Sequence, residues 1–199
     1  MRPNHYMLAV SLLAVAVALS QSKEQEKTHA DHMEHHFDPK ESAKSFDDPA
    51  RDTWQLPDRV IAALNLKRGQ VVADIGAGTG YFSVRLAKSG AAPKVYAADI
   101  EPSMVNYLRE RAAKEGLNNV IAVQAAADQA NLPEPVDLIR VVIIDFKPDS
   151  PEGPPKEFRF PPEKFKSEMG KAGYTLAKQY DFLPRQQFLI FEVAGQSSR

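Results

Sequence analysis

Acidic side chains and a run of glycines stand where strands are expected to end. The segment Asp74-Ile75-Gly76-Ala77-Gly78-Thr79-Gly80 follows one apolar run, Asp99 ends a second, and Asp128 follows a third. Glycine permits the tight turns and close backbone approach that a ligand site needs. Backbone N–H groups at the helix start that follows, near Tyr81, can face a polar ligand. The carboxylates can each accept a hydrogen bond from a ligand donor, so the pattern predicts a site for a ligand rich in donors.

The same features have simpler interpretations. NAD-binding domains share the glycine turn and the acid after the second strand, but their fingerprint requires Gly or Ala where Tyr81 stands. Asp128 is of a type that caps helices and closes turns. Ile100 is of a type that commonly belongs to a core.

Strands and helices are expected to alternate around these residues. Apolar runs at 71–75, 95–100 and 120–123 are typical of buried parallel strands. Helical periods are expected from about Pro57 and at 81–89, 103–115 and 162–172. This order predicts an α/β domain with a parallel sheet. Two last strands, at 174–180 and 187–193, predict an antiparallel hairpin at one edge.

The chain resembles class I S-adenosylmethionine (SAM)-dependent methyltransferases, especially small bacterial members with an export signal, through VVADIGAGTGYFSVRLA, VYAADIEPSM and the acid before NLP. The resemblance covers about 51–193 and implies a Rossmann-like fold with SAM as cofactor. It implies that Asp99 accepts from both ribose hydroxyls, that Ile100 packs on the adenine, and that Asp128 accepts from the adenine amino group. The positions that it assigns to the amino-acid end of the cofactor are Asp74, Gly76, Gly78 and Gly80, with Ala77, Thr79 and Tyr81 counted in the same cofactor-binding loop.

The chain departs from this family after the third strand. Residues 136–139 match the start of the family's fourth strand and 140–146 its fifth, with nothing between them. Adjacent parallel strands need a crossover of roughly a dozen residues or more, so a block on the order of thirty residues is absent. We expect one fused strand from about Val136 to Phe146 beside the first strand, a sheet of six strands, and one exposed sheet face. An internal deletion, a compact natural variant and an incomplete or mis-assembled sequence all stay open.

The first fifty residues have a composition of their own. A positive front, the apolar run 7–19 and small residues up to Ser20 predict a secretory signal peptide over residues 1–20. The alternative is an uncleaved membrane anchor, although the run is shorter than the ~20 residues of a comfortable span. Both interpretations place the protein outside the cytoplasm, periplasmic, secreted or membrane-anchored.

Residues 21–50 are a polar, histidine-rich leader before the methyltransferase-like domain, 51–199. The leader is expected to fold only near its end. Its histidines could share a helix face and bind a metal ion, although a solvated tail is the simpler interpretation; they are His29, His32, His35 and His36.

Composition and resemblance together limit the function. The net charge of −1 offers no global field for nucleic acid, and the absence of cysteine excludes disulfides and thiolate chemistry. The expected function is methyl transfer from SAM to an unknown small-molecule or protein acceptor. A degenerate SAM-binding module without turnover is the alternative, since the family's fourth strand faces the transferred methyl group. An exported metal-binding protein is the third hypothesis.

The acceptor side is less defined. No residue is assigned as catalytic base; Asp145 follows a strand at the ligand edge, but an acid there is commonly a cap. The proline-rich loop with residues 158–160 could cover a substrate or be a surface connection. Trp54 and Gln55 could join a lid, with packing the simpler role for Trp54.

Overall fold

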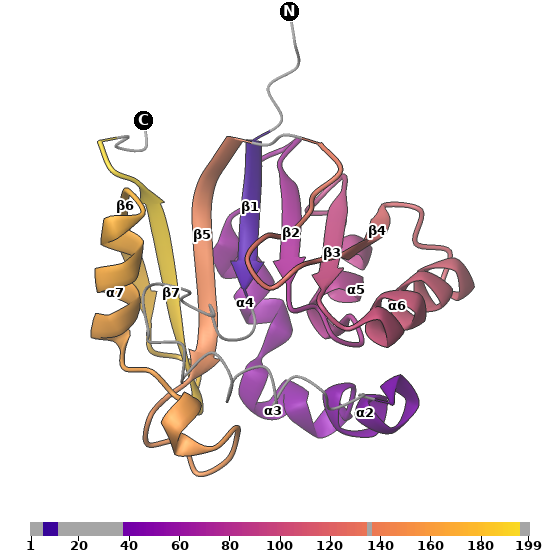
Figure 1. The fold of residues 1–199 in the computed structure, drawn as a ribbon, viewed down its shortest axis with the longest axis horizontal. Coiled ribbons are helices and arrows are strands. Elements are labelled where there is room, and N and C mark those ends of the chain that lie inside the picture. Colours follow the sequence, from indigo (N-terminus) through magenta and orange to yellow (C-terminus); the bar gives the residue numbers. More distant parts are fainter. Residues whose placement is uncertain (1–5, 12–37, 135–136, 196–199) are drawn as a thin grey trace, which may run out of the picture.

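The computed structural model describes residues 6–11, 38–134 and 137–195, which form a layered α/β fold around one mixed sheet (Figure 1). The strand order is β4-β3-β2-β1-β5-β7-β6. The first five strands of this order run parallel, and β7 is antiparallel to both β5 and β6. The strands are β1 (Tyr6–Ser11), β2 (Val71–Ile75), β3 (Val95–Asp99), β4 (Val120–Gln124), β5 (Asp137–Phe146), β6 (Tyr174–Tyr180) and β7 (Gln186–Val193). The predicted Rossmann-like α/β class with a C-terminal antiparallel hairpin is confirmed.

The sheet has seven strands rather than the six expected from the sequence. β5 is the single fused strand that was expected, but it does not lie beside β2. The added strand β1 lies between them, parallel to both, with Ala9 opposite Ala73 on β2 and Val141 on β5. The prediction of six strands was wrong because a segment from the N-terminal end of the chain, rather than a crossover unit, fills the place between β2 and β5.

The leader is described in part. Tyr6–Ser11 of the predicted signal peptide forms β1, and the remainder of residues 1–20 lies outside the described residues. The four leader histidines also lie outside them, so the metal hypothesis stays a prediction. The end of the leader folds, as expected, into helix α2 (Pro39–Phe46). Within the described ranges, no helix combines the length and apolar character that a membrane span requires.

Prolines mark where several helices begin. The helical elements besides α2 are η1 (Pro49–Arg51), α3 (Asp52–Gln55), α4 (Pro57–Leu64), α5 (Tyr81–Lys88), α6 (Pro102–Lys114), η2 (Lys156–Phe158) and α7 (Pro162–Lys171). α2, α4, α6 and α7 each start at a proline, whose fixed φ suits the first helical position and whose missing N–H would have no partner there. In Figure 1 the parallel strands point downward, and α2 and α3 lie below their carboxyl ends.

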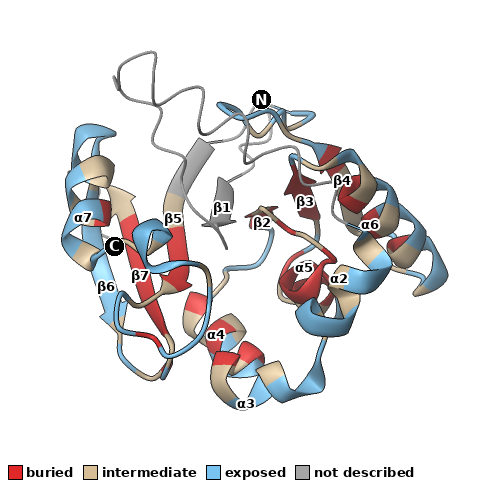
Figure 2. Ribbon diagram, turned by 60° about the horizontal axis from the view of Figure 1, so that its bottom comes forward, coloured by how far each residue is buried: buried red, intermediate tan, exposed pale blue. Residues whose placement is uncertain are grey.

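One large core joins the two halves of the sheet. Val72 of β2 and Ile144 of β5 belong to the same buried cluster, which also contains Leu64 of α4 and Leu86 of α5. The opposite face of β5 and β7 is covered by α7, where Phe165 packs with Ile143 and Leu189. The buried residues run through the strands and α5, while the outer helix faces are exposed (Figure 2).

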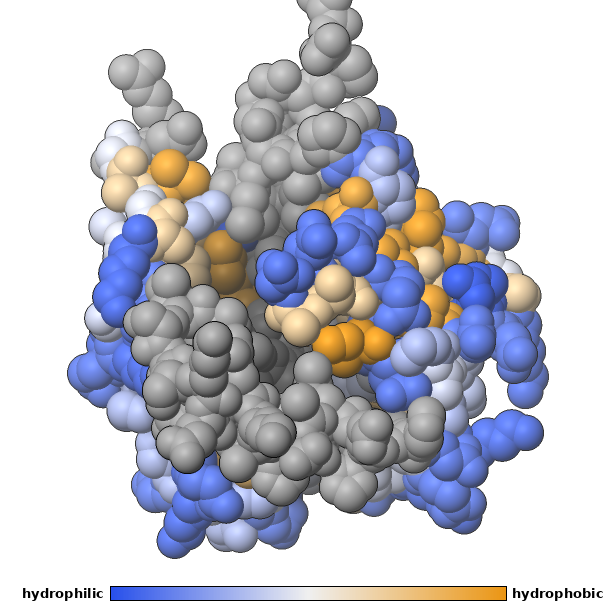
Figure 3. All heavy atoms as spheres, in the orientation of Figure 1, coloured by the Kyte–Doolittle hydropathy of each residue, from blue (hydrophilic) through white to orange (hydrophobic). Residues whose placement is uncertain are grey.

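The face expected to be exposed by the missing block is buried on β3 and partly buried on β4. Ala73 and Tyr96 lie in a second cluster with exposed fractions of 0% and 1%. Ala125 and Leu132, from the segment after β4, pack against this cluster. Hydrophobic surface is visible on this side of the molecule, over the β3–β4 half (Figure 3). The segment after β4 therefore covers this face in part, in the place where the family has a helix.

Candidate cofactor site

The glycine loop between β2 and α5 has the backbone conformation that its sequence predicts. Gly76, Gly78 and Gly80 have φ values of +75°, +54° and +92°, in the region that residues with a Cβ rarely adopt. A Cβ on Gly80 would lie 2.7 Å from Leu108 Cδ2. Glycine is therefore required at Gly80 both by the turn and by the packing of α6 beneath it.

Asp99 holds the glycine loop against the end of β3. Its Oδ2 accepts a hydrogen bond from the Gly78 N–H at 2.7 Å, and its Oδ1 accepts from the Glu101 N–H at 2.9 Å. The loop is also fixed through the backbone, since Gly76 and Ala77 both donate to the Ala98 carbonyl. The sequence predicts one ligand site for Asp99 and the glycine loop, although they follow different strands. In the structure they are in direct contact at the carboxyl ends of the parallel strands.

Asp74 lies beneath this loop and is completely buried. Its Oδ2 accepts from the Ser83 hydroxyl at 2.6 Å, whereas its Oδ1 is buried without a hydrogen-bond partner among the described residues. Burial raises the pKa of Asp74 to about 6, because the charged form loses its hydration. Asp74 Oδ1 can therefore accept a hydrogen bond from a ligand bound at the carboxyl ends of the parallel strands.

Thr79, in the glycine loop, also has a buried side-chain oxygen without a hydrogen-bond partner among the described residues. Its side chain is 1% exposed, and its Oγ1 has no partner in the described structure. Buried polar atoms are nearly always satisfied, so free oxygens on both Asp74 and Thr79 fit a ligand with donor groups. An ammonium group, such as that of a bound amino acid moiety, has the required chemistry.

Two arginine side chains contact the ring of Tyr81, which was not expected from the sequence. The Tyr81 hydroxyl donates to Asp52, and the guanidinium carbons of Arg51 and Arg85 lie 4.1 Å and 3.9 Å from its ring centroid. Desolvation and the neighbouring carboxylate raise the pKa of Tyr81. The ring is thus fixed as a neutral platform between two cations. Tyr81 and Asp52 are 29 positions apart, and no local pattern links them.

Helix α2 closes the other side of the loop, which the sequence also does not indicate. The Phe46 ring lies 3.5 Å from the position of a Cβ on Gly78. Arg111 of α6 donates to the Asp47 carboxylate at 2.9 Å and to the Thr79 carbonyl at 2.8 Å. One partly buried cation therefore links the residue after α2 to the glycine loop.

Ile100 and Asp128 extend the edge beyond Asp99. Ile100 is 42% exposed, which suits an apolar contact with a flat ligand rather than a core position. The Ala125 N–H donates to the Asp99 carbonyl at 2.9 Å, and the Ala126 N–H donates to Gln129, so Asp128 stands in a tight turn next to the site. Asp128 is exposed, and its expected contact with the adenine stays a prediction.

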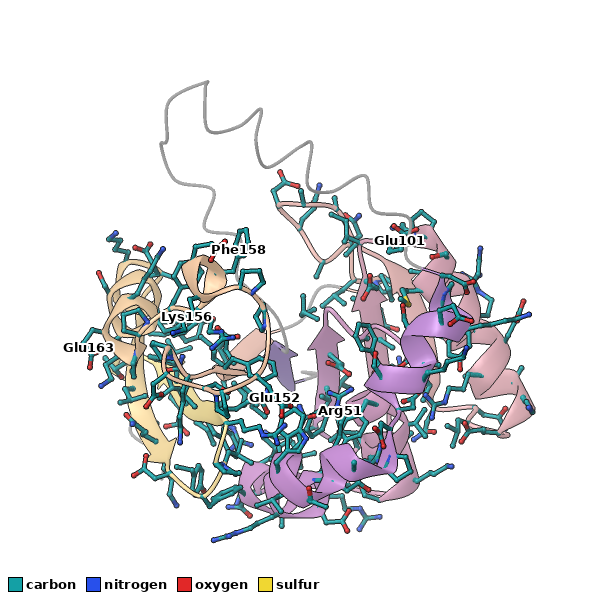
Figure 4. All side chains as sticks on the ribbon, turned by 90° about the horizontal axis from the view of Figure 1, so that it is seen from below. Arg51, Glu101, Glu152, Lys156, Phe158 and Glu163 are labelled. Atoms are coloured by element: carbon teal, nitrogen blue, oxygen red, sulfur yellow. The ribbon has the colours of Figure 1, made fainter. Side chains whose placement is uncertain are left out.

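The residues expected on the acceptor side belong to α3 and to the segment after β5. Trp54 packs between Phe146 and Arg185, at 5.8 Å and 5.0 Å, while Gln55 is buried and accepts from Arg51. Packing is therefore the observed role of Trp54. Seen from below, Arg51 and the loop residues Glu152 and Phe158 all lie at the carboxyl end of the sheet (Figure 4).

Arg159 shapes the loop after β5. Its guanidinium donates to the carbonyls of Ser150 and Pro154. Gly153 lies against the Phe146 ring so closely that a Cβ would stand 2.6 Å from it. The loop is thus folded back over the end of β5 rather than extended into solvent.

Asp145 lies beneath this loop. It is 6% exposed, its Oδ1 accepts from the Phe146 N–H at 2.8 Å, and its Oδ2 has no partner among the described residues. Burial raises its pKa. The side chain is therefore a cap, as one interpretation expected, and it also keeps one oxygen free.

Comparison with known proteins finds methyltransferases that are similar to this chain in sequence and in fold. Residues 72–152 match the family model described as Methyltransferase domain. The crystal structure of a SAM-dependent methyltransferase from Aquifex aeolicus is 27% identical, covers 79% of this chain and 100% of its own, and has a TM-score of 0.70.

More distant relatives share part of the chain or the fold. The protein-L-isoaspartate O-methyltransferase of Aeropyrum pernix is 33% identical over 96 residues, which are 47% of this chain and 37% of that protein. This chain therefore spans well under half of that relative. The SAM-bound magnesium protoporphyrin IX methyltransferase (ChlM) of Synechocystis PCC 6803, 16% identical, covers 88% of this chain and 100% of its own with a TM-score of 0.56, and shares the fold.

Proposed function

We propose that this chain binds SAM across the glycine loop and Asp99, and transfers the methyl group to an acceptor that enters from the β5 side. SAM is the cofactor that the family match and the Aquifex structure support. The observation that carries the proposal is the contact between Asp99 and Gly78, which joins the acid and the turn at the carboxyl ends of parallel strands. Ligands of such sheets bind at this edge.

Each part of the cofactor has a candidate partner at this edge. We expect Asp99 to exchange its bond with Gly78 for bonds from the ribose hydroxyls, and the exposed Ile100 to pack on the adenine. The free oxygens of Asp74 and Thr79 are acceptors for the ammonium of the methionine moiety. Bound SAM supplies a methyl group on a sulfonium, so the protein has to bind and orient rather than activate the electrophile.

The acceptor is positioned by the segment after β5. Methyl transfer gains most from holding the nucleophile in line with the methyl group. Only an acceptor that loses a proton needs a base. Asp145 is the candidate proton acceptor on this side, because its Oδ2 has no partner among the described residues and burial raises its pKa. We expect the acceptor to be a small molecule or a protein side chain.

A SAM-binding module without turnover is the second candidate. The continuous strand β5 favours it, because the place between β2 and β5 is taken by β1 rather than by a strand that follows β4 in the chain. This candidate has the same cofactor site and differs only on the acceptor side. Binding and turnover therefore need separate measurements.

Calorimetric titration of SAM into the full chain tests the cofactor site. We expect micromolar binding that Asp99→Asn weakens by about tenfold to a hundredfold, the range for hydrogen bonds to a charged group. Asp149→Asn is the matched control, since Asp149 is an exposed acid in the loop after β5. Equal affinity of all three proteins, or no binding by a folded protein, contradicts the proposal.

Transfer of label from methyl-tritiated SAM to a fractionated extract then separates the two candidates. Labelled product that appears with the natural chain and is lost with Asp99→Asn supports the methyltransferase. Normal binding without labelled product in any fraction supports the non-catalytic module.

A further inference from the structure

We infer that the segment that resembles an export signal is a structural strand of the sheet, and that its removal opens a strand-binding slot between β2 and β5. The occupant to which we commit is the chain's own Tyr6–Ser11. Loss of residues 1–20 by cleavage after Ser20 then leaves the sheet without its central strand. The inference does not depend on SAM binding, since it concerns only the sheet.

Continuous pairing on both sides of β1 supports this inference. On one side Met7 to Ser11 pair with Val71 to Ile75 in unbroken register. On the other side the same strand pairs with β5 from Tyr6 to Ser11, with one irregularity between Met7 and Leu8. β1 is therefore a central strand whose two edges are both used.

The slot has a width that only a strand fills. Neighbouring strands lie about 4.8 Å apart, so without β1 the edges of β2 and β5 would stand about twice that distance apart with unpaired backbone groups. Unpaired buried backbone groups are costly. Val72 of β2 and Val142 of β5 pack in one cluster with Leu86 of α5. If β2 and β5 moved together to close the gap, one of them would have to shift relative to α5 and lose this packing.

The sequence of the occupant suits this position. Met7-Leu8-Ala9-Val10 is apolar throughout, as is typical of strands covered on both faces. A signal-peptide core needs the same composition, which explains how one segment meets both descriptions. Val10 pairs with Asp74, so the strand also supports the part of β2 that carries the ligand site.

A single substitution in the full chain tests the role of the strand. Ala9→Pro removes one ladder N–H from a central strand, and we expect the thermal midpoint to fall by about 10 °C or more, or the cooperative transition to disappear. Ala9→Gly, which keeps the N–H and adds no side-chain atoms, is the matched control and should lower the midpoint by only a few degrees. An unchanged midpoint in Ala9→Pro overturns the inference.

Strand addition in trans provides the second test. The chain that begins at Gln21 should lack the cooperative transition of the full chain, and a synthetic peptide of residues 1–20 should restore it, whereas the same peptide with Ala9→Pro should not. A truncated chain that unfolds at the midpoint of the full chain indicates a sheet closed without β1 and overturns the inference. Failure of the natural peptide to restore the transition overturns it as well. Neither readout involves SAM, so failure of the proposed function would leave both results interpretable.

Discussion

At the scale of single residues, the carboxyl of Asp74 links the site to stability. Its pKa is about 6 in the folded protein against an ordinary value of 3.8. Between these values the folded state holds the proton more tightly than the unfolded chain. The free energy of unfolding therefore falls as pH rises through this window. At neutral pH the ionised carboxylate of Asp74 therefore lowers the free energy of unfolding.

Asp74→Asn removes this titration and should change how stability depends on pH. Relative to the natural chain, we expect the free energy of unfolding of the variant to rise by about 2 kcal/mol between about pH 4 and pH 7, since each pKa unit corresponds to about 1.4 kcal/mol and part of the effect lies below pH 4. Urea unfolding of both proteins at the two pH values measures it. The loss of the Ser83 hydrogen bond shifts both values alike, and Asp145 titrates in both proteins. A difference between the two proteins that does not vary with pH would contradict the assignment.

The spacing of residues predicts the glycine loop and Asp99 because both follow from local rules for strand ends and turns. It does not predict that Arg51 and Arg85 enclose Tyr81, or that Phe46 covers Gly78. Those contacts join elements whose order in space is set by the sheet rather than by the neighbouring sequence. A single sequence carries no signal for them.

At the scale of elements, two glycines that look alike in the sequence have opposite roles. Gly80 has φ +92° and would place a Cβ 2.7 Å from Leu108, whereas Gly170 lies within α7 with open space around it. The first serves the turn into α5. The second only adds conformational freedom to a helix.

Alanine substitution should therefore change stability in opposite directions. We expect Gly80→Ala to lower the free energy of unfolding by about 1–3 kcal/mol, through strain and the contact with Leu108. Gly170→Ala should raise it by about 0.5–1 kcal/mol, because alanine is the better helix former. Denaturant unfolding of the two variants checks both values, and the same sign of change in both would show that the backbone assignment of one of them is wrong.

Periodicity predicts most elements of the described chain, and the fused strand β5 follows from the absence of a crossover. The position of β1 could not be predicted from the sequence. An apolar run of this length fits a signal core and a buried strand equally well, and only the unfilled place between β2 and β5 distinguishes them. The expected sheet of six strands follows correctly from the segments after Arg51, but it omits the segment that completes the sheet.

At the scale of the whole molecule, one core connects the cofactor half to the hairpin half. Val72 beside the glycine loop and Phe188 on β7 share a buried cluster. The chain contains one tryptophan, and Trp54 packs against Phe146 and Arg185 on the hairpin side. The Trp54 ring also lies 5.9 Å from the guanidinium carbon of Arg51, which contacts Tyr81. Its fluorescence therefore reports on the contact between α3 and the hairpin half.

Because the core is shared, a ligand at the glycine loop should stabilise both halves together. At a SAM concentration about one hundred times its dissociation constant, linkage adds about 2.7 kcal/mol, which for a chain of this size raises the midpoint by about 5–10 °C. We expect the midpoint from Trp54 fluorescence and that from far-ultraviolet circular dichroism to coincide and to rise by the same amount, as a single cooperative unit requires. A dichroism midpoint that rises while the Trp54 midpoint stays fixed would mean that the hairpin half unfolds independently, and that the shared cluster does not couple the acceptor side to the cofactor.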